Sequence, residues 1–347
     1  VILRKQIIII MGMRMCMCNL HQKIKDGIGL ECISWEDRTT NEKYVLAQKT
    51  KGYLQQAYGS MAEEWIKGFD AQVEYLLDKW KLTIQRQEEN SRFGAIFYTV
   101  SAEYGDTVLK IIPYFCERMK NEIRCYQKLP YTTMCNMLDY ETTVGAILLK
   151  YIPGENRQDV EPYLALLKQM REESRLVTAE DMEVTDYWIA WEQSVQYAKM
   201  SLESVSWNYQ RFMLKCLAQC VKQINHAKQL SKYYVHGDAH VHNIVGDNPL
   251  VLIDPIGYKA PFGVEYARFL GTWYRENEIR TDELREMLVT LSTDAEDYRN
   301  NCLMLGMDVT FRACNTFSEG NTQSEIYDAI EWADRIWYSI QKILDAE

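Results

Sequence analysis

Apolar residues between positions 58 and 80 recur at steps of three and four residues. The recurring positions are Trp65, Phe69, Val73, Leu76, Leu77 and Trp80. This spacing places apolar side chains along one face of a helix. The pattern predicts one amphipathic helix or a pair of helices here, within a helical region that begins near Lys49.

Beyond residue 92 the pattern becomes typical of strands. Two apolar-rich stretches, 93–102 and 106–112, flank a turn at 103–106 and favour a hairpin. Residues 116–129 return to helical spacing, and 137–141 and 145–152 predict two more strands. Pro153 and Gly154 then break the pattern. We expect the order β-β-β-α-β-β, which makes a small sheet lobe.

The rest of the chain is predominantly helical in pattern. Residues 160–232 are mostly helical, and 263–347 end on an amphipathic stretch at 326–344. Between them, 233–245 and 250–255 predict two strands around a turn at 246–249. The sequence therefore predicts an α+β fold in which a small sheet lobe precedes a larger helical lobe.

Composition narrows the class of protein further. The 347 residues are 47% hydrophobic and 25% charged, as expected of a globular chain. The net charge of −10 argues against nucleic-acid binding. The apolar run near the start is too short to span a membrane and is interrupted by Arg14. The ten cysteines form no C-x-x-C pair, so we expect reduced thiols in a cytoplasmic protein.

Polar residues are concentrated in the predicted strand–loop–strand at 233–255. The sequence HGDAHVHN begins at His236 and is followed by Ile253-Asp254-Pro255. Asp238 and Asn243 are five residues apart, the spacing between the base and the metal-binding amide of a kinase catalytic loop. Asp254 follows an apolar strand, where an unpaired carboxylate would be costly, so a metal ligand is favoured. These residue types suit phosphoryl transfer, which needs a base and oxygen ligands for Mg²⁺.

Two other interpretations of this loop remain. It can be an ordinary polar loop, or its histidines and Asp238 can form a metallohydrolase site of the H-x-D-x-H-x-H kind. Such a site needs further histidines later in the chain, and none follows His242; only His21 and His226 lie upstream. We therefore favour the kinase interpretation, with His240 and His242 as loop or substrate-side residues.

The combination of HGD-x4-N with a following IDP resembles the aminoglycoside phosphotransferase branch of the protein-kinase-like fold. Pro255 and the tryptophans between 65 and 80 resemble, more closely, the aminoglycoside/hydroxyurea resistance kinases, which include streptomycin 6-kinases. The resemblance covers residues 50 to 345 approximately. It implies a bilobal fold, ATP and Mg²⁺ as cofactors, and a cationic small-molecule acceptor such as streptomycin. Kinases of choline, homoserine or sugar amines, and a nucleotide-binding pseudokinase, stay open as alternatives.

The resemblance also implies roles for individual residues. Asp238 would be the catalytic base, and Asn243 and Asp254 would bind Mg²⁺. Lys110, in the stretch VLKII, would contact the α- and β-phosphates of ATP. Glu122 would be its ion-pair partner on the following helix, with Glu117 as the alternative.

Further positions either match the family or depart from it. The backbone from Lys150 to Ile152 would meet adenine, and Gly94 would help to cover the phosphates in a chain with no G-x-G-x-x-G in this lobe. His236 would shape the loop. Ile256 stands where the family often has Lys, and Glu265 stands where relatives have Asp.

We divide the chain accordingly into three parts. Residues 1–48 are an N-terminal extension to which we assign no function, 49–152 are a nucleotide-binding sheet lobe, and 153–347 are a helical lobe with the catalytic hairpin and the acceptor site. The stretch 155–203 holds 11 acidic and 5 basic residues. It either lines a pocket for a cationic acceptor or forms a solvated helical face.

Overall fold

The computed structural model describes residues 43–88, 91, 93–129, 132–154, 159–175, 184–318 and 321–346. Tyr44–Glu347 form one compact unit. The predicted extension at 1–48 lies almost entirely outside the described residues. The boundary that we placed between 152 and 153 stays a prediction, although the two regions differ clearly in architecture.

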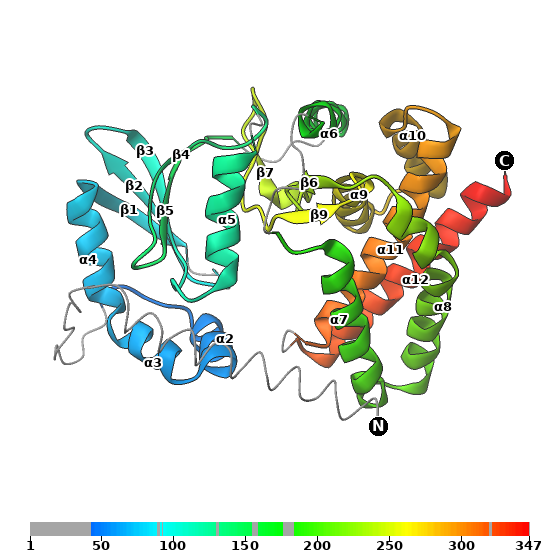
Figure 1. The fold of residues 1–347 in the computed structure, drawn as a ribbon, viewed down its shortest axis with the longest axis horizontal. Coiled ribbons are helices and arrows are strands. Elements are labelled where there is room, and N and C mark those ends of the chain that lie inside the picture. The colour runs from blue at the N-terminus through cyan, green and yellow to red at the C-terminus, as the bar shows by residue number, and fades with distance from the viewer. Residues whose placement is uncertain are drawn as a thin grey trace. The chain divides into compact units, whose positions relative to one another are not determined.

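The first region is a five-stranded antiparallel sheet with helices (Figure 1). The strand order is β1-β2-β3-β5-β4, and α5 lies between β3 and β4 in the chain. The predicted order β-β-β-α-β-β is therefore confirmed, although the sequence pattern located only four of the five strands and assigned no element to residues 82–88, which form β1. Of the two alternatives for residues 58–80, one helix or a pair, the structure has the pair, α3 and α4. The elements are α2 (Gln48–Tyr58), α3 (Ser60–Lys67), α4 (Phe69–Lys79), β1 (Leu82–Glu88), β2 (Ala95–Ser101), β3 (Gly105–Ile111), α5 (Glu117–Lys128), β4 (Met137–Glu141) and β5 (Ala146–Lys150).

The two faces of this sheet bury different cores. Leu109 and Ile111 of β3 pack in one cluster with residues of α3 and α4, such as Trp65 and Leu76. Successive side chains of a strand point to opposite faces. The residue between them, Lys110, therefore lies on the other face of β3, which α5 covers. This alternation directs a lysine toward a helix that carries glutamates.

The second region is mostly helical and holds two short strand pairs, β6 with β9 and β7 with β8 (Figure 1). The predicted helices and the predicted strand–loop–strand are both present. The elements are α6 (Glu161–Ser174), α7 (Tyr187–Ser201), η2 (Leu202–Ser204), α8 (Trp207–Gln229), β6 (Tyr233–Val235), η3 (Val241–Asn243), β7 (Ile244–Val245), β8 (Val251–Leu252), β9 (Tyr258–Ala260), α9 (Gly263–Asn277), α10 (Thr281–Leu291), α11 (Ala295–Thr316) and α12 (Gln323–Asp345).

The helical region has one extensive core that reaches under the catalytic hairpin. Every residue of α9 from Gly263 to Trp273 is buried, and α11 is buried along most of its length. The same core contains Val235, Ala239 and Val241 of the hairpin. The polar loop is thus anchored on both sides by buried apolar residues, and its conformation is fixed by packing.

The cysteines and the apolar character of the helices can be compared with what the composition indicated. The seven cysteines of the described part of the chain are all free and buried, as expected of reduced structural thiols. Within that same part, no helix combines the length and the apolar character that crossing a bilayer requires.

Candidate active site

Lys110 is held between two carboxylates from different elements. Its Nζ lies 2.8 and 2.9 Å from the two carboxylate oxygens of Glu122 on α5, and 2.6 Å from Oδ1 of Asp254. Burial acts to lower the pKa of Lys110, but Asp254 and Glu122 outweigh it, so the pKa is raised. Burial also raises the pKa of Glu122, yet the bidentate contact favours the ionised pair. The alternative partner, Glu117, pairs instead with Lys120.

Asp254 reaches this lysine through an uncommon backbone conformation. Its φ is 60°, in the left-handed region that few non-glycine residues adopt. Its backbone N–H donates to the hydroxyl of Tyr126 at 3.3 Å. Burial would raise the pKa of its carboxyl, but the charge of Lys110 lowers it. Asp254 is therefore ionised at the end of its strand, as a cation ligand must be.

His236 fixes the shape of the loop, as predicted. Its Nδ1 accepts from the backbone N–H of Asp238 at 3.2 Å, so its Nε2 carries the hydrogen and donates to the carbonyl of Ile253 at 2.9 Å. Burial lowers the pKa of His236 to about 4, which keeps the ring neutral. One imidazole therefore ties the loop that carries Asp238 to the residue preceding Asp254.

A buried carboxyl group holds the same loop from the other side. The backbone N–H of Gly237 donates to Oε1 of Glu265 on α9 at 2.7 Å. Gly237 has a φ of 81°, and a Cβ there would lie 2.6 Å from the ring of Tyr258, so only glycine fits. Burial raises the pKa of Glu265 to about 8, against the lowering effect of two backbone N–H groups and Arg268. Glu265 thus acts as a positioning residue for the loop.

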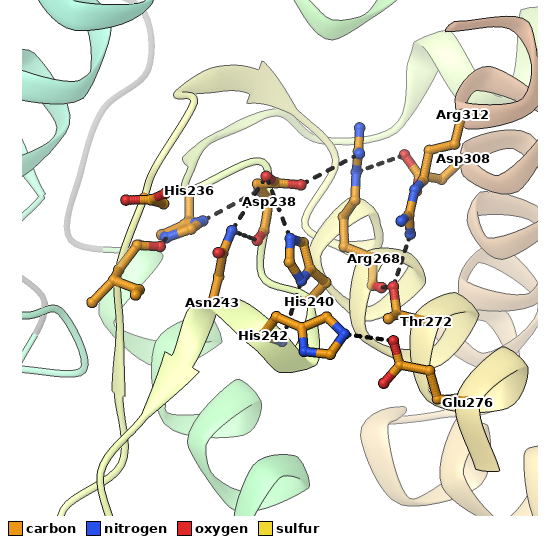
Figure 2. Close-up of polar contacts among 12 residues, drawn as sticks. His236, Asp238, His240, His242, Asn243, Arg268, Thr272, Glu276, Asp308 and Arg312 are labelled. Carbon is orange, nitrogen blue, oxygen red and sulfur yellow. Dashed lines mark hydrogen bonds and ion pairs between the residues drawn. The ribbon is translucent and has the colours of Figure 1, made fainter. Parts of the chain in front are cut away.

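Asp238 and Asn243 face each other across the loop (Figure 2). The amide Nδ2 of Asn243 donates to Oδ2 of Asp238 at 3.2 Å and to its carbonyl at 3.0 Å. With its nitrogen engaged, the amide oxygen of Asn243 is left as a ligand. That oxygen and the ionised Asp254 are the hard donors that Mg²⁺ prefers, and phosphate oxygens and waters complete such sites. The residues present therefore fit Mg²⁺.

Arginines surround Asp238 on its far side. Arg268 of α9 lies between two carboxylates, with Nη1 3.5 Å from Asp238 and Nε 3.1 Å from Asp308 (Figure 2). Asp308 also accepts from the hydroxyl of Tyr187 at 3.0 Å. Burial would raise the pKa of Asp238, but His240, whose Nε2 lies 3.7 Å from Oδ2 of Asp238, and then Arg268, Arg118 and Arg312 lower it below its usual value. Burial lowers the pKa of His240, so the arginines are the permanent charges among these groups.

Two cavities meet at this loop. The smaller, of about 280 Å³, is lined by Gly94, Lys110, Asn243 and Asp254 among others. The larger, of about 620 Å³, is lined mainly by residues of the helical region. Both are lined by Phe93, Arg118, Asp238 and His240. Asp238 therefore stands at the junction of the two cavities.

Gly94 closes the smaller cavity because its backbone lies against β3. A Cβ at this position would come within 1.9 Å of the carbonyl oxygen of Ile111.

The predicted adenine contacts lie elsewhere, at the end of β5, and neither cavity includes Lys150 or Ile152. The N–H groups of Lys150 and Tyr151 donate to other backbone carbonyls, whereas no described residue bonds the N–H of Ile152. The adenine role of Lys150 and Ile152 stays a prediction.

Arg118 is a site residue that sequence reasoning missed. It lines both cavities, lies 4.5 Å from the ring centroid of Phe93, and precedes Glu122 by one helical turn on α5. Burial acts to lower the pKa of Arg118, but Glu122, Asp238 and Asp254 together raise it. Residues four apart share one helix face. The spacing of Arg118 from Glu122 was therefore the signal in the sequence by which Arg118 could have been found.

The histidines of the loop do not form a metal centre. Nε2 of His242 lies 2.6 Å from Glu276, and Nδ1 of His240 accepts from the backbone N–H of His242 (Figure 2). Across the described parts of the chain, no group of three or more His, Cys, Asp and Glu side chains is arranged to hold a metal ion. The metallohydrolase alternative therefore gains no support.

The acidic stretch at 155–203 lies only partly within the described residues. Its described carboxylates line neither cavity. Asp186 caps α7 and pairs with Lys232, and Glu192 pairs with Lys228. This part of the stretch matches the solvated helical face of the two predicted alternatives. Glu155, Glu180, Asp181 and Glu183 lie outside the description.

No model of a known protein family matches the sequence, and no curated protein resembles it in sequence. Solved structures, in contrast, match its fold. A choline kinase from Cryptosporidium parvum Iowa II has a TM-score of 0.57 and 10% identity, over 78% of this chain and 91% of its own. A choline/ethanolamine kinase family protein from Mesorhizobium loti has a TM-score of 0.56 and 12% identity, over 79% and 94%.

A third similar structure is a ternary complex. It is a thermostable mutant of the aminoglycoside phosphotransferase APH(4)-Ia in a ternary complex with ADP and hygromycin B. Its TM-score is 0.53 and its identity 15%, over 77% of this chain and 97% of its own. At these identities the likeness shows the fold. The chain thus has the bilobal protein-kinase-like fold, with a small antiparallel sheet lobe and a larger helical lobe, as predicted.

Proposed function

We propose that the protein is an ATP-dependent phosphotransferase that moves the γ-phosphate of ATP to an alcohol group of a small molecule. The observation that carries this proposal is the position of Asp238 where the two cavities meet. One cavity has the lysine, amide and carboxylate that phosphates and Mg²⁺ require, and the other is of the size of small-molecule sites. The similarity to small-molecule kinases in fold supports the same conclusion.

The residues of the site account for the steps of the reaction. Asp238, kept ionised by the arginines, accepts the proton of the acceptor hydroxyl as its oxygen attacks the γ-phosphorus. The bond between that phosphorus and the β,γ-bridging oxygen breaks, and ADP leaves. Lys110, fixed by Glu122, holds the phosphates in line, and Arg118 adds charge at the junction. Mg²⁺, held by Asn243 and Asp254, would offset charge on the phosphates.

The acceptor follows less directly from these residues. The resemblance of the sequence predicts an aminoglycoside such as streptomycin, and APH(4)-Ia is one of the structures similar in fold. The choline kinase is similar in fold with a TM-score of 0.57, which is higher than the 0.53 of APH(4)-Ia. We therefore propose the alcohol-phosphorylating reaction first and treat the acceptor as a separate question.

The test is turnover of Mg·ATP with a panel of alcohols. ADP release and new phosphorus-31 signals would be followed with streptomycin, other aminoglycosides, choline, homoserine and sugar amines. We expect a phosphate ester with at least one alcohol, and none with Asp238→Asn protein. ATP that binds without any phosphate transfer would favour the pseudokinase instead.

A further inference from the structure

The larger cavity is lined by more cations than anions. Its described lining contains four arginines and two carboxylates, those of Glu117 and Asp238. Glu117 is occupied by Lys120, with the two charges 2.7 Å apart. The charge of the cavity therefore depends on what the arginines pair with. The four are Arg118, Arg268, Arg275 and Arg312.

Two of these arginines, Arg275 and Arg312, form no ion pair with a carboxylate of the described residues, although Asp308 and Asp238 partly offset the charge of Arg312. Arg268 is paired by Asp308 and Asp238. Arg312, in contrast, donates to the hydroxyl of Thr272 at 2.9 Å, and within the described chain no ion pair involves Arg312 or Arg275 (Figure 2). Burial and the neighbouring Arg268 lower the pKa of Arg312, as expected where a cation is not fully compensated. The lining of the cavity thus carries more positive than negative charge.

Three aromatic rings of the cavity, those of Phe93, Phe311 and Trp332, are already covered by these cations. Arg118 lies 4.5 Å from the ring centroid of Phe93, and Arg268 lies 5.4 Å from that of Phe311. Arg312 and Arg275 lie 4.9 and 6.0 Å from the Trp332 centroid. Ring faces are what a site uses to bind a quaternary or protonated amine. At these rings the protein's own guanidinium groups already lie where such an amine would bind.

Trp332 is in turn firmly positioned at the wall of the cavity. It is 3% exposed, and its Nε1 donates to the carbonyl of Gly271 on α9 at 3.0 Å. Arg275 and Thr272, the partner of Arg312, belong to the same helix. The guanidinium groups of Arg275 and Arg312 are therefore held near one fixed ring. A guanidinium is a planar donor that binds an oxyanion through two N–H groups, so this placement suits oxyanion binding.

We propose that the acceptor alcohol carries an anionic group, a carboxylate or a phosphate, which Arg275 and Arg312 bind beside Trp332 while its hydroxyl is presented to Asp238. This inference rests on the proposed function and names the substrate class of the same site. It departs from the cationic acceptor that the sequence predicts. A polycation placed in this cavity would meet the arginines, and each close pair of like charges is unfavourable.

Polyols that differ only in charge test this proposal. Gluconate, sorbitol and glucamine share a six-carbon polyol frame and are anionic, neutral and cationic. Isothermal titration into the wild-type protein with Mg·ADP measures binding without turnover. We expect gluconate or sorbitol 6-phosphate to bind at least about 10-fold more tightly than sorbitol, as one charge-assisted hydrogen-bond pair predicts. Because gluconate carries only a carboxylate and sorbitol 6-phosphate only a phosphate, the comparison of these two anions distinguishes the two groups.

Substitutions assign the preference to the two arginines. Arg275→Gln, at an exposed position, and Arg312→Gln should each reduce the preference for the anion, whereas Arg312→Lys should restore part of it. Arg285→Gln removes the same charge from an exposed position outside the cavity and should change nothing. If Arg312→Gln does not fold, Arg275→Gln and Arg312→Lys still decide the question.

Three results would overturn the inference. These are tighter binding of sorbitol, glucamine or streptomycin than of either anion, a preference that survives both glutamine variants, and a lack of anion binding by protein that binds Mg·ADP. Turnover of the same compounds with Mg·ATP is followed separately. Phosphorylation of a neutral or cationic alcohol would keep the kinase function and remove the anion site. Anion binding with no phosphate transfer to any alcohol would keep the anion site and contradict the kinase function.

Discussion

Glu265 gives a quantitative prediction because its carboxyl is buried beneath the catalytic loop. Burial raises its pKa from the ordinary value of 4.5 to about 8. Its Oε2 is buried without a hydrogen-bond partner among the described residues, which suits a neutral acid better than a carboxylate. Between these two pH values, the folded state holds a proton that the unfolded chain has lost. Stability conferred by this group is thus fully present below pH 4.5 and is lost as the pH rises through about 8.

The substitution Glu265→Gln removes this titration and keeps an oxygen that can accept from Gly237. A difference of one bound proton corresponds to about 1.4 kcal/mol per pH unit. The unfolding free energy of the wild type, measured by urea denaturation, should therefore fall relative to that of Glu265→Gln by about 1.4 kcal/mol per unit between about pH 5.5 and 7.5. Across the whole range from 4.5 to about 8 the effect is about 5 kcal/mol.

A matched control comes from the neighbouring helix α10. Glu286 is exposed and lines neither cavity, so Glu286→Gln removes a carboxylate without touching the loop. It should not reproduce the pH-dependent difference. A constant difference between wild type and Glu265→Gln across this range would refute the reasoning, because it would mean that Glu265 ionises alike in the folded and unfolded chains.

Three further substitutions test other contacts. Glu122→Gln removes a charge partner of Lys110 and should lower ATP turnover about 10- to 100-fold in steady-state assays, since positioning of the phosphates is lost; unchanged turnover would argue against the pair. Gly237→Ala forces a side chain against Tyr258 at positive φ and should lower the unfolding free energy by about 1–3 kcal/mol; an unchanged melting temperature would contradict this. Asp254→Ala should abolish the Mg²⁺-dependent rise in melting temperature with ATP; a preserved shift would show that Asp254 is not a ligand.

The sequence predicted those parts of the site that depend on local spacing. Asp238 and Asn243 are close because five residues of one loop separate them. Such spacing is a short-range regularity, and periodicity of the same kind predicted most of the strands and helices. The pairing of Lys110 with Glu122 was instead expected from the resemblance to the phosphotransferase branch, and strand alternation accounts for it in the structure.

What the sequence did not predict depends on long-range packing. Arg268, Asp308 and Arg312 come together because α9 packs against α11, and a single sequence carries no record of which helices meet. The sign of charge in the larger cavity follows from that packing. The acidic stretch near 155–203 suggested a cationic acceptor, yet its described carboxylates lie outside the cavity that arginines line.

The central claim is that Asp238 accepts the proton of an acceptor alcohol during transfer from ATP. The most direct measurement compares wild-type and Asp238→Asn protein in two assays, phosphate transfer from Mg·ATP and the ATP-induced rise in melting temperature. We expect the substitution to reduce transfer at least about 100-fold, as the loss of a general base predicts, while the rise in melting temperature remains. Transfer by Asp238→Asn protein within a few-fold of wild type would contradict the account.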